Sequence, residues 1–323
     1  PGEAVVMPVA RVWGDWAADC LLRPWTRGHR SVILTARDGF RSALSMPLDS
    51  TRRCFNELSW PQVEQAVAID RATLVWPFGA CEQHGPHLPL ATDALFADRL
   101  LDAVLEKLPP ESPIWRLPVQ AIGFSPEHVG FSGTLSFSSR LLISMVVELG
   151  EQLAAMGWKR LVLFNAHGGQ IALLQVAARE LRKRCPSLSV LPCFLWSGVE
   201  GLTSLIAEPE LSDGLHAGLA ETSLMLRLAP SLVSESRPAD GLKTSFPSHQ
   251  APPGWSLEGA APCAWLTSDV SSSGVIGNSC GASEELGAAL ETLLIRHWIQ
   301  MLQSLVDSDW PPRSGAALGS SGS

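Results

Sequence analysis

The fold is decided by the apolar run Ala72-Thr-Leu-Val-Trp-Pro-Phe78 and the polar turn that follows it, Gly79-Ala-Cys-Glu-Gln-His-Gly-Pro-His-Leu-Pro-Leu-Ala-Thr-Asp93. A short apolar run that ends in glycine is typical of a buried parallel strand. Thr92 or Asp93 would then begin a helix through Leu108, because apolar residues recur there at helical spacing. The stretch therefore predicts a strand–turn–helix unit of an α/β protein.

The turn carries Glu82, His84, His87 and Asp93, which are carboxylate and imidazole donors of the kind that Zn, Mn or Fe prefer. It therefore predicts half of a metal site. The alternative is a polar loop in which Asp93 caps the following helix. Cys81 stands beside Glu82, but no His–Asn pair supports a thiol nucleophile, so a small buried cysteine is the simpler interpretation.

Strand and helix alternate along the middle of the chain. We expect strands at 114–122, 160–165 and 188–196, and helices at 60–68, 139–155, 170–184 and 283–305. This alternation predicts an α/β/α sandwich, a mainly parallel sheet flanked by helices on both faces. His167 follows the strand 160–165 and would lie at the same carboxyl edge as the Glu82 turn, so we expect it to be a third metal ligand.

Two other segments carry candidate residues. Glu221 opens an apolar helical run, where it either binds metal or simply stabilises the helix N-terminus. The Gly-rich loop 125–138, which contains a histidine, either lines a pocket or leads into an ordinary Thr-Leu-Ser-Phe strand.

Composition excludes several classes of protein. The 323 residues carry a net charge of -8, which argues against a nucleic-acid partner because phosphate binding needs clustered cations. There is no apolar run near the ~20 residues of a membrane span, so we expect a soluble protein with no membrane partner. The seven cysteines are scattered without a C-x-x-C pair, which favours a reducing cytoplasm over a disulfide framework.

Charge also suggests a boundary near the N-terminus. Residues 1–53 contain eight arginines, no lysine and five acids. We predict that 1–53 is an extension outside the fold, with a transit peptide as the alternative. The domain would then cover 54–305, and the Gly- and Ser-rich end, 306–323, would be a flexible tail.

Over residues 54–305 the sequence resembles the creatininase (creatinine amidohydrolase) family. Four motifs carry the resemblance: Glu82-Gln-His84-Gly-Pro-His-Leu-Pro with Asp93, Phe-Ser-Gly-Thr-Leu-Ser at 131–136, Asn165-Ala-His167-Gly-Gly, and His216-Ala-Gly-Leu-Ala-Glu221. The resemblance implies two divalent metal ions per subunit (Zn, Mn or Fe), hydrolysis of an amide C–N bond, and commonly a homohexamer.

By position, the resemblance implies a role for each matched residue. The metal ligands would be Glu82, His84, Asp93 and His167, with Asp93 bridging both ions. Creatininase has Tyr-Glu where this chain has Gly168-Gly169, so Glu221 is expected to be the fifth ligand. His216 would be the catalytic acid/base, and the matched residues expected to contact the substrate are Ser132, Gly133 and Asp213. Trp196, outside the motifs at the end of the strand 188–196, is expected to contact the substrate as a replacement for one aromatic wall.

The substrate stays open between a small molecule and a peptide amide. Gly168 and Ser212 stand where creatininase has aromatic residues, so we expect creatinine itself to be a poor substrate. The alternatives are a formamide deformylase, a peptidase of the mycofactocin-precursor type, and, from another class, an inactive metal-binding scaffold subunit.

Overall fold

The computed structural model describes residues 48, 53–241, 255–258 and 261–311. Most of the predicted extension 1–53 and the end of the predicted tail 306–323 lie outside the described residues, so both boundaries stay predictions. Within the described ranges, no helix has both the length and the apolar character that a membrane span requires.

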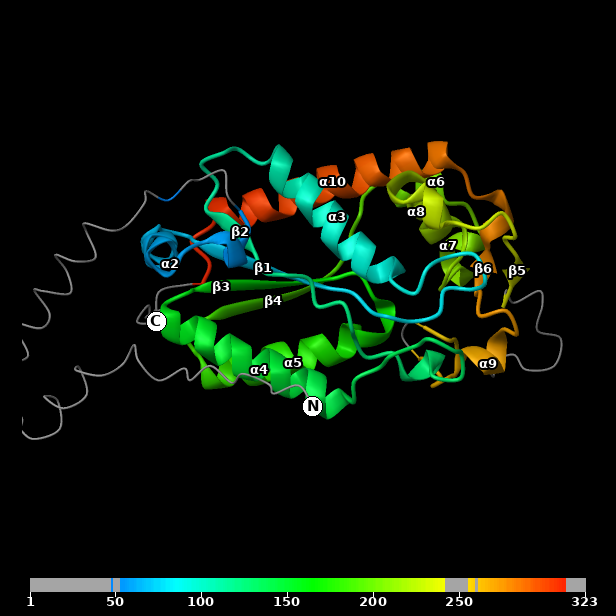
Figure 1. Cartoon of the computed structure of the whole chain (residues 1–323), viewed down its shortest axis with the longest axis horizontal. Helices are drawn as coiled ribbons and strands as arrows, with labels where there is room; N and C mark the ends of the chain where they lie inside the picture. The colour runs from blue at the N-terminus through cyan, green and yellow to red at the C-terminus, as the bar shows by residue number, and fades with distance from the viewer. Residues whose placement is uncertain (1–47, 49–52, 242–254, 259–260, 312–323) are drawn as a thin grey trace, which may run out of the picture. The chain divides into compact units, whose positions relative to one another are not determined.

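The centre of the fold is a four-stranded parallel sheet in the order β2-β1-β3-β4 (Figure 1). The strands are β2 (Ile114–Arg116), β1 (Thr73–Phe78), β3 (Arg160–Asn165) and β4 (Ser189–Phe194). Thr73 is aligned with Ile114 on one side and Arg160 on the other, and Arg160 with Ser189. The predicted parallel sheet is therefore confirmed, and the strand of the opening stretch lies at its centre.

Helices cover both faces of the sheet, as predicted. One layer contains α3 (Thr92–Lys107), α8 (Leu219–Leu228) and α10 (Glu284–Asp307), and the other contains α4 (Ser139–Met156) and α5 (Ile171–Arg184) (Figure 1). Alternate residues of each strand face opposite layers, as the period of two requires. For example, Val75 belongs to the core under α3, whereas Leu74 and Trp76 belong to the core that α4 and α5 cover.

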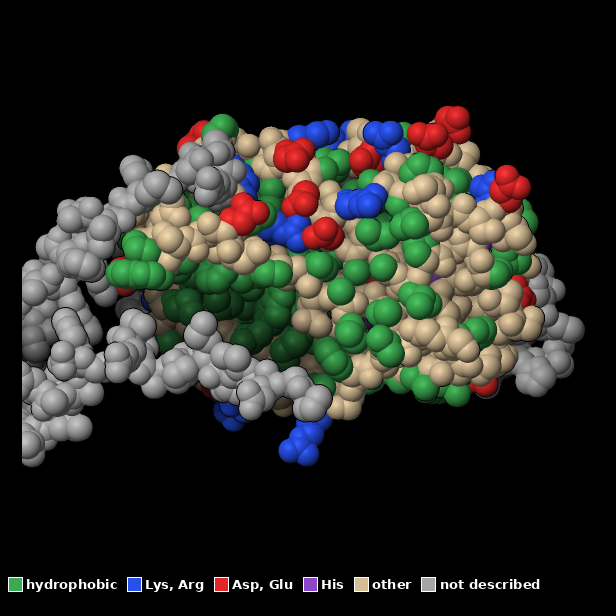
Figure 2. Space-filling view, in the orientation of Figure 1, with side chains coloured by type: hydrophobic (Ala, Val, Ile, Leu, Met, Phe, Trp, Pro, Cys, Tyr) green, Lys and Arg blue, Asp and Glu red, His purple; other side chains and the backbone are tan. Residues whose placement is uncertain are grey.

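In the space-filling view, charged side chains gather over α3 and α10, and hydrophobic side chains gather beside the strands (Figure 2). A shorter helix, α2 (Trp60–Ala68), adds Ala66 to the second core. The other described elements are short: α6 (Leu202–Leu205), α7 (Glu210–Asp213), α9 (Thr267–Val270), the antiparallel pair β5 (Ala239–Asp240) and β6 (Gly277–Asn278), and the 3₁₀ turns η1 (Phe55–Glu57), η2 (Pro126–His128), η3 (Gly168–Gln170), η4 (Pro230–Leu232) and η6 (Ser279–Gly281).

One strand prediction was wrong in length, and the strand alternative for the loop 125–138 is contradicted. The strand predicted at 114–122 ends at Arg116, because the register with β1 is lost after Leu117: Gln120 donates to Pro77, where the ladder's period of two requires Val119. Only the amides of Leu117 and Gln120 still bond to β1, so the following segment leaves the sheet early. The Thr-Leu-Ser-Phe segment at 134–137 is a loop with a single bridge, Leu135 to Cys81.

Candidate metal centre

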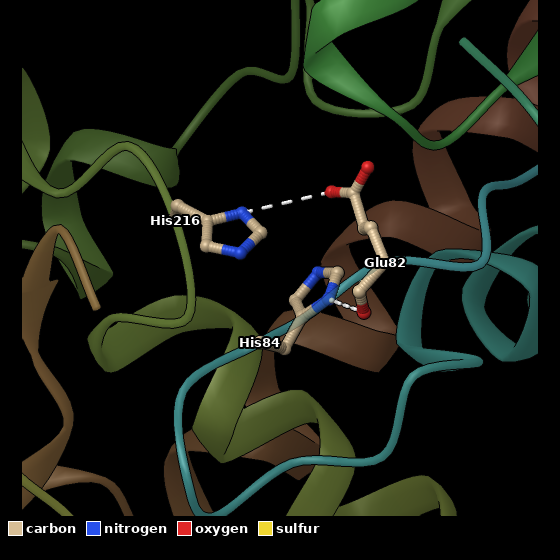
Figure 3. A group of neighbouring side chains, drawn as sticks. All are labelled: Glu82, His84 and His216. Carbon is tan, nitrogen blue, oxygen red and sulfur yellow. Dashed lines mark hydrogen bonds and ion pairs between the residues drawn. The ribbon is translucent and has the colours of Figure 1, made fainter. Parts of the chain in front are cut away.

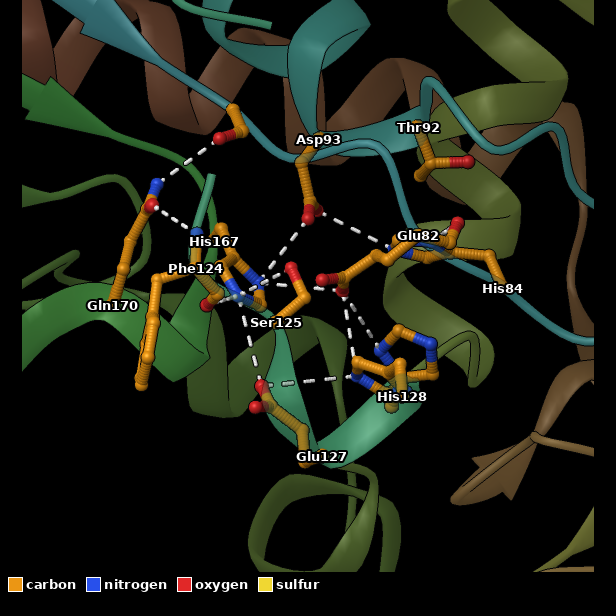
Figure 4. A network of polar contacts seen from close by, with 12 residues as sticks. Glu82, His84, Thr92, Asp93, Phe124, Ser125, Glu127, His128, His167 and Gln170 are labelled. Atoms are coloured by element: carbon orange, nitrogen blue, oxygen red, sulfur yellow. Dashed lines mark hydrogen bonds and ion pairs between the residues drawn. The ribbon is translucent and has the colours of Figure 1, made fainter. Parts of the chain in front are cut away.

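The predicted metal-binding residues converge at the carboxyl end of the parallel sheet, although they come from separate segments. Glu82 and His84 follow β1, Asp93 lies in the first turn of α3, His167 follows β3, and Glu221 lies in the first turn of α8. Figure 4 shows the side chains of Glu82, Asp93 and His167 pointing toward one another. The carboxyl ends of neighbouring parallel strands share one edge, which brings these segments together.

Gly79 brings Asp93 close to the end of β1. A Cβ atom at Gly79 would lie 2.4 Å from the backbone N and Cα of Ala94, so only glycine allows α3 to start this close. The carbonyl of Gly79 also accepts a hydrogen bond from Gln170 Nε2 at 3.1 Å. This bond ties the end of β1 to the turn that carries His167.

Asp93 lies between two imidazoles. Its Oδ1 is 3.4 Å from His84 Nε2, and its Oδ2 is 3.3 Å from His167 Nδ1. The helix begins after Ala91 without a side-chain cap, and Asp93 Oδ2 has no hydrogen-bond partner. The alternative that Asp93 serves as a helix cap is therefore wrong, and its two oxygens face two separate groups of donors.

The donors form three groups in which the ligand atoms lie within 4.8 Å of one another. These groups are Glu82 with His84 and His216, Glu82 with Glu127 and His167, and His84 with Asp93 and Glu221. Together they contain all five residues predicted as ligands. The site therefore has the donor types that suit a divalent transition metal.

Buried atoms without hydrogen-bond partners test whether this site fits a cation. Both carboxylate oxygens of Glu82, Nε2 of His84 and Oδ2 of Asp93 are buried and unpartnered. Glu82 is completely buried. Because burying an unpaired carboxylate costs several kcal/mol, these convergent lone pairs fit bound cations. The nearest partners that the described residues supply are histidine nitrogens at 3.3 to 3.4 Å.

Backbone carbonyls fix the ring orientation of the two predicted histidine ligands (Figure 4). Nε2 of His167 donates to the carbonyl of Phe124 at 2.9 Å, and Nδ1 of His84 donates to the carbonyl of Glu82 at 3.2 Å. The opposite nitrogen of each ring faces Asp93, and in the neutral ring this nitrogen carries the lone pair. Such an outer hydrogen bond sets the tautomer that metal-binding histidines use.

His216 approaches the cluster from the segment before α8 (Figure 3). Its Nε2 donates to the carbonyl of Gln83 at 2.6 Å, which leaves Nδ1 as an acceptor 3.8 Å from Glu82 Oε1. Its ring stacks between those of His84 and His128, with centroid distances of 4.2 and 4.1 Å. His216 is thus a buried, oriented proton acceptor at the edge of the donor groups.

Sequence reasoning missed Glu127 and His128, which lie in η2. Nε2 of His128 is 3.4 Å from Glu82 Oε1, while its Nδ1 accepts from Gln83 Nε2 at 2.8 Å and lies 2.7 Å from Thr267 Oγ1. Because Gln83 Nε2 can only donate, His128 carries its proton on Nε2, toward Glu82. The only sequence signal was the histidine of loop 125–138.

Electrostatics divides the four histidines into two pairs. Burial disfavours every charged imidazole, but surrounding carboxylates outweigh it at two of them, raising the pKa of His84 to about 9 and the pKa of His167 well above its usual value. Burial and neighbouring histidines lower the pKa of His216 well below its usual value and the pKa of His128 to about 4. The negative potential is therefore centred on the two predicted histidine ligands.

The residues predicted to contact the substrate occupy different places. Ser132 and Gly133 are exposed in a loop whose next residue, Thr134, accepts a hydrogen bond from the amide of Gln83 at 3.1 Å. That loop therefore lies against the metal-binding turn.

The other two predicted contacts come from the segments after β4. Asp213 ends α7, and its Oδ1 accepts from Ser212 Oγ at 3.2 Å. Trp196 packs edge-on against Phe96 of α3, at a ring distance of 6.3 Å. A substrate contact for each of these residues stays a prediction.

Comparisons with known proteins match the chain to creatininases and to a peptidase. The family model of creatininase, described as creatinine amidohydrolase, matches residues 56–302. The chain is 36% identical over 181 residues to a mycofactocin precursor peptide peptidase of Mycobacterium tuberculosis (strain CDC 1551 / Oshkosh), which covers 54% of this chain and 66% of that protein. The chain thus spans just under two thirds of the peptidase's length. It is 28% identical to the creatinine amidohydrolase of Pseudomonas putida over 270 residues, 79% of this chain and 96% of that protein.

Solved structures share the fold. A manganese creatininase superposes with a TM-score of 0.65 at 25% identity, over 80% of this chain and 100% of that one. A mutant creatininase of the Zn-Zn type gives a TM-score of 0.64 at 25% identity, over 80% of this chain and 99% of that one. Manganese and zinc are therefore the metals named for these neighbours.

Proposed function

The chain belongs to the creatininase family, and on that premise we propose that it is a metal-dependent amidohydrolase holding two divalent cations at the carboxyl end of its sheet. The observation that carries the proposal is the convergence of unpartnered buried atoms from Glu82, His84 and Asp93. Their donor types suit Zn, Mn or Fe.

Charge supports two ions rather than one. Four carboxylates meet in the donor groups, those of Glu82, Asp93, Glu127 and Glu221. Their combined formal charge equals that which two divalent cations neutralise, and an unneutralised buried charge is costly. Asp93 would bridge the ions, because its two oxygens face His84 on one side and His167 on the other.

Two bound divalent cations would polarise an amide carbonyl and lower the pKa of an attacking water toward about 7. The chain's own residues would then move the proton. Nδ1 of His216 is unprotonated and faces the donor groups, so it would accept the proton of the water and return it to the departing nitrogen. The Gln83 carbonyl would hold the ring in place throughout.

We propose a linear, peptidic amide as the substrate class. The peptidase relative supports this, and so does the free space at Gly168, where a Cβ atom would meet nothing within 4 Å. Ser212, the other position expected to be aromatic in creatininase, is exposed. A small cyclic amide is the second candidate, supported by the match over nearly the full length of the creatinine amidohydrolase.

Steady-state kinetics on the metal-loaded protein tests the proposal. We expect short peptides to be hydrolysed and creatinine to react with a kcat/KM below about 10⁴ M⁻¹s⁻¹, the lower end of the ordinary enzyme range. Replacing His216 with alanine should lower kcat by about 10² to 10⁴ while metal content is kept. Efficient turnover of creatinine would assign the small cyclic amide instead. A metal-loaded protein inactive toward short peptides, creatinine and formamides would favour the scaffold alternative.

The homohexamer that the family resemblance implies is part of this proposal. Light scattering coupled to size-exclusion chromatography measures it directly, and a monomeric mass in the metal-loaded state would rule it out.

A further inference from the structure

Gly169 stands where a side chain would collide with another residue's carboxylate. A Cβ atom at Gly169 would lie 1.9 Å from Glu127 Oε1, 2.9 Å from Glu127 Cδ and 2.7 Å from His167 Nε2. Real Cβ atoms do not approach heavy atoms this closely. The volume that a side chain at 169 would enter is therefore already filled by Glu127, which comes from η2, over 40 residues away in the sequence.

The neighbouring glycine shows that this crowding is specific. A Cβ atom at Gly168 would meet no atom within 4 Å. Neither glycine has the positive φ that would require the residue type for backbone reasons. A Cβ atom at position 169 would thus displace the Glu127 carboxylate, whereas one at position 168 would displace nothing.

The Glu127 carboxylate points into the metal centre (Figure 4). Its Oε1 is 3.6 Å from His167 Nε2 and 3.9 Å from His128 Nε2, and it shares a donor group with Glu82 and His167. Its side chain is 13% exposed. Its ion-pair partners are two histidines, with no arginine or lysine among them.

We propose that Glu127 is a metal ligand, supplied by η2 in place of a side chain at position 169. The inference rests on the proposed metal function and deepens it. Glu221 was expected to replace the glutamate that creatininase has at the position of Gly169, and Glu127 would be a further ligand beside it. The Glu127 carboxylate lies where the Cβ atom of a residue at 169 would lie. Glu127 joins Glu82, His167 and one oxygen of Asp93 around one ion, and His84, Glu221 and the other oxygen of Asp93 face the second.

Metal content of a charge-removing variant tests this ligand. Glu127→Gln keeps the shape of the side chain but removes its negative charge. We expect it to retain one of two metal equivalents by elemental analysis, with the lost ion bound more than 100-fold more weakly in chelator competition. An outer partner of a ligand typically costs only about 10- to 100-fold. Retention of both equivalents with affinity reduced less than 100-fold would overturn the inference.

Relocating the carboxylate sharpens the test. The double variant Glu127→Ala with Gly169→Glu removes the clash and returns a carboxylate from the β3 turn, so we expect it to regain the second equivalent. Gly169→Ala alone should lose metal because its Cβ displaces Glu127, whereas the matched control Gly168→Ala should keep both equivalents. A double variant that stays at one equivalent would show that the two positions are not interchangeable.

The wild-type protein separates this inference from the proposed function. If the wild type binds no metal after saturation, the metal function itself fails. If the wild type binds two ions and Glu127→Gln also binds two, only the role of Glu127 fails. Circular dichroism and thermal unfolding of each variant distinguish loss of metal from loss of fold.

Discussion

Buried polar groups have hydrogen-bond partners at the amino end of the parallel sheet and lack them at its carboxyl end. At the amino end, Arg160 begins β3 and donates to the carbonyls of Leu305 and Ser308 at 2.8 and 2.7 Å. Arg71, just before β1, donates to the carbonyls of Val306 and Asp307. These carbonyls belong to the end of α10, where cations are favoured by the unpaired C=O groups.

At the carboxyl end, convergent groups lack partners. Seven buried side-chain atoms of the described residues have no hydrogen-bond partner, and five of them belong to the turn and helix start at 82–93. The other two, Trp158 Nε1 and Gln303 Oε1, are neutral and belong to separate elements. A buried polar group with partners holds the fold together, whereas a convergent set without partners indicates a missing ligand.

Removing Asp93 should produce the largest effect, because its two oxygens serve both halves of the site. We expect Asp93→Asn to lose both metal equivalents and to lower activity by more than about 100-fold, beyond the loss typical of an outer partner. Elemental analysis after metal saturation measures this. If both ions remain bound, the contrast between the two ends of the sheet does not reflect metal binding.

Removing Arg160 should destabilise the fold without touching the metals. Arg160→Met removes two charge-assisted hydrogen bonds at the end of α10, although the Leu305 carbonyl keeps the donors of Ser308. The loss should lower the free energy of unfolding by about 1 to 3 kcal/mol. Denaturant unfolding measures the change, and the metal content should stay at two equivalents. Arg184→Met is the control, because its pair with Glu151 is exposed and worth at most about 1 kcal/mol.

Two truncations should distinguish Arg53, which contacts the amino end of the sheet, from the rest of the predicted extension. Arg53 donates to the carbonyls of Pro109, Ser112 and Ile114, beside the start of β2. We expect deletion of 1–47 to leave stability, metal content and activity unchanged. Deletion of 1–53 should cost about 1 kcal/mol in thermal unfolding because it also removes Arg53. Insolubility of the shorter deletion would move the domain boundary into the N-terminal segment.

Asp240 offers a satisfied carboxylate for comparison with Asp93. Burial alone would raise the pKa of Asp240, but hydrogen bonds from Ser273, Gly241 and Ser271 outweigh it and lower that pKa below its ordinary value of 3.8. Such a group stabilises the fold above its unfolded pKa, and the stabilisation is lost as pH falls through the lower folded pKa.

We therefore expect Asp240→Asn to be less stable than the wild type above about pH 5 and to approach it as the pH falls toward about 2. The difference should be small, because this carboxyl is partly exposed and water screens it. Chemical unfolding at several pH values measures it, and metal content should not change. A loss of metal in Asp240→Asn would contradict the conclusion that only the acids without hydrogen-bond partners bind metal.

The sequence by itself determined the elements and most of the donors. Apolar periodicity predicted α2 with its observed bounds and placed α3, α4, α5 and α10 within about two residues. Glu82, His84, Asp93 and His167 were found because parallel strands place the residues that follow them at one edge. The length of β2 was wrong because a local apolar pattern does not show that the chain loses its register with β1 between Leu117 and Gln120.

Only the tertiary structure decided how the donors are divided and which others join them. Local sequence left Glu221 open between stabilising the helix N-terminus and binding metal. In the structure its Oε2 accepts from the amide of Ala217 at 2.6 Å and also lies 3.9 Å from His84 Nε2, so its role as a ligand stays a prediction. Glu127 could not be found from spacing, because it meets Gly169 through loops that are distant in the chain. Ring tautomers likewise depend on carbonyls such as that of Phe124, which a distant segment supplies. Residue types are local information, but which lone pairs face each other depends on packing between segments.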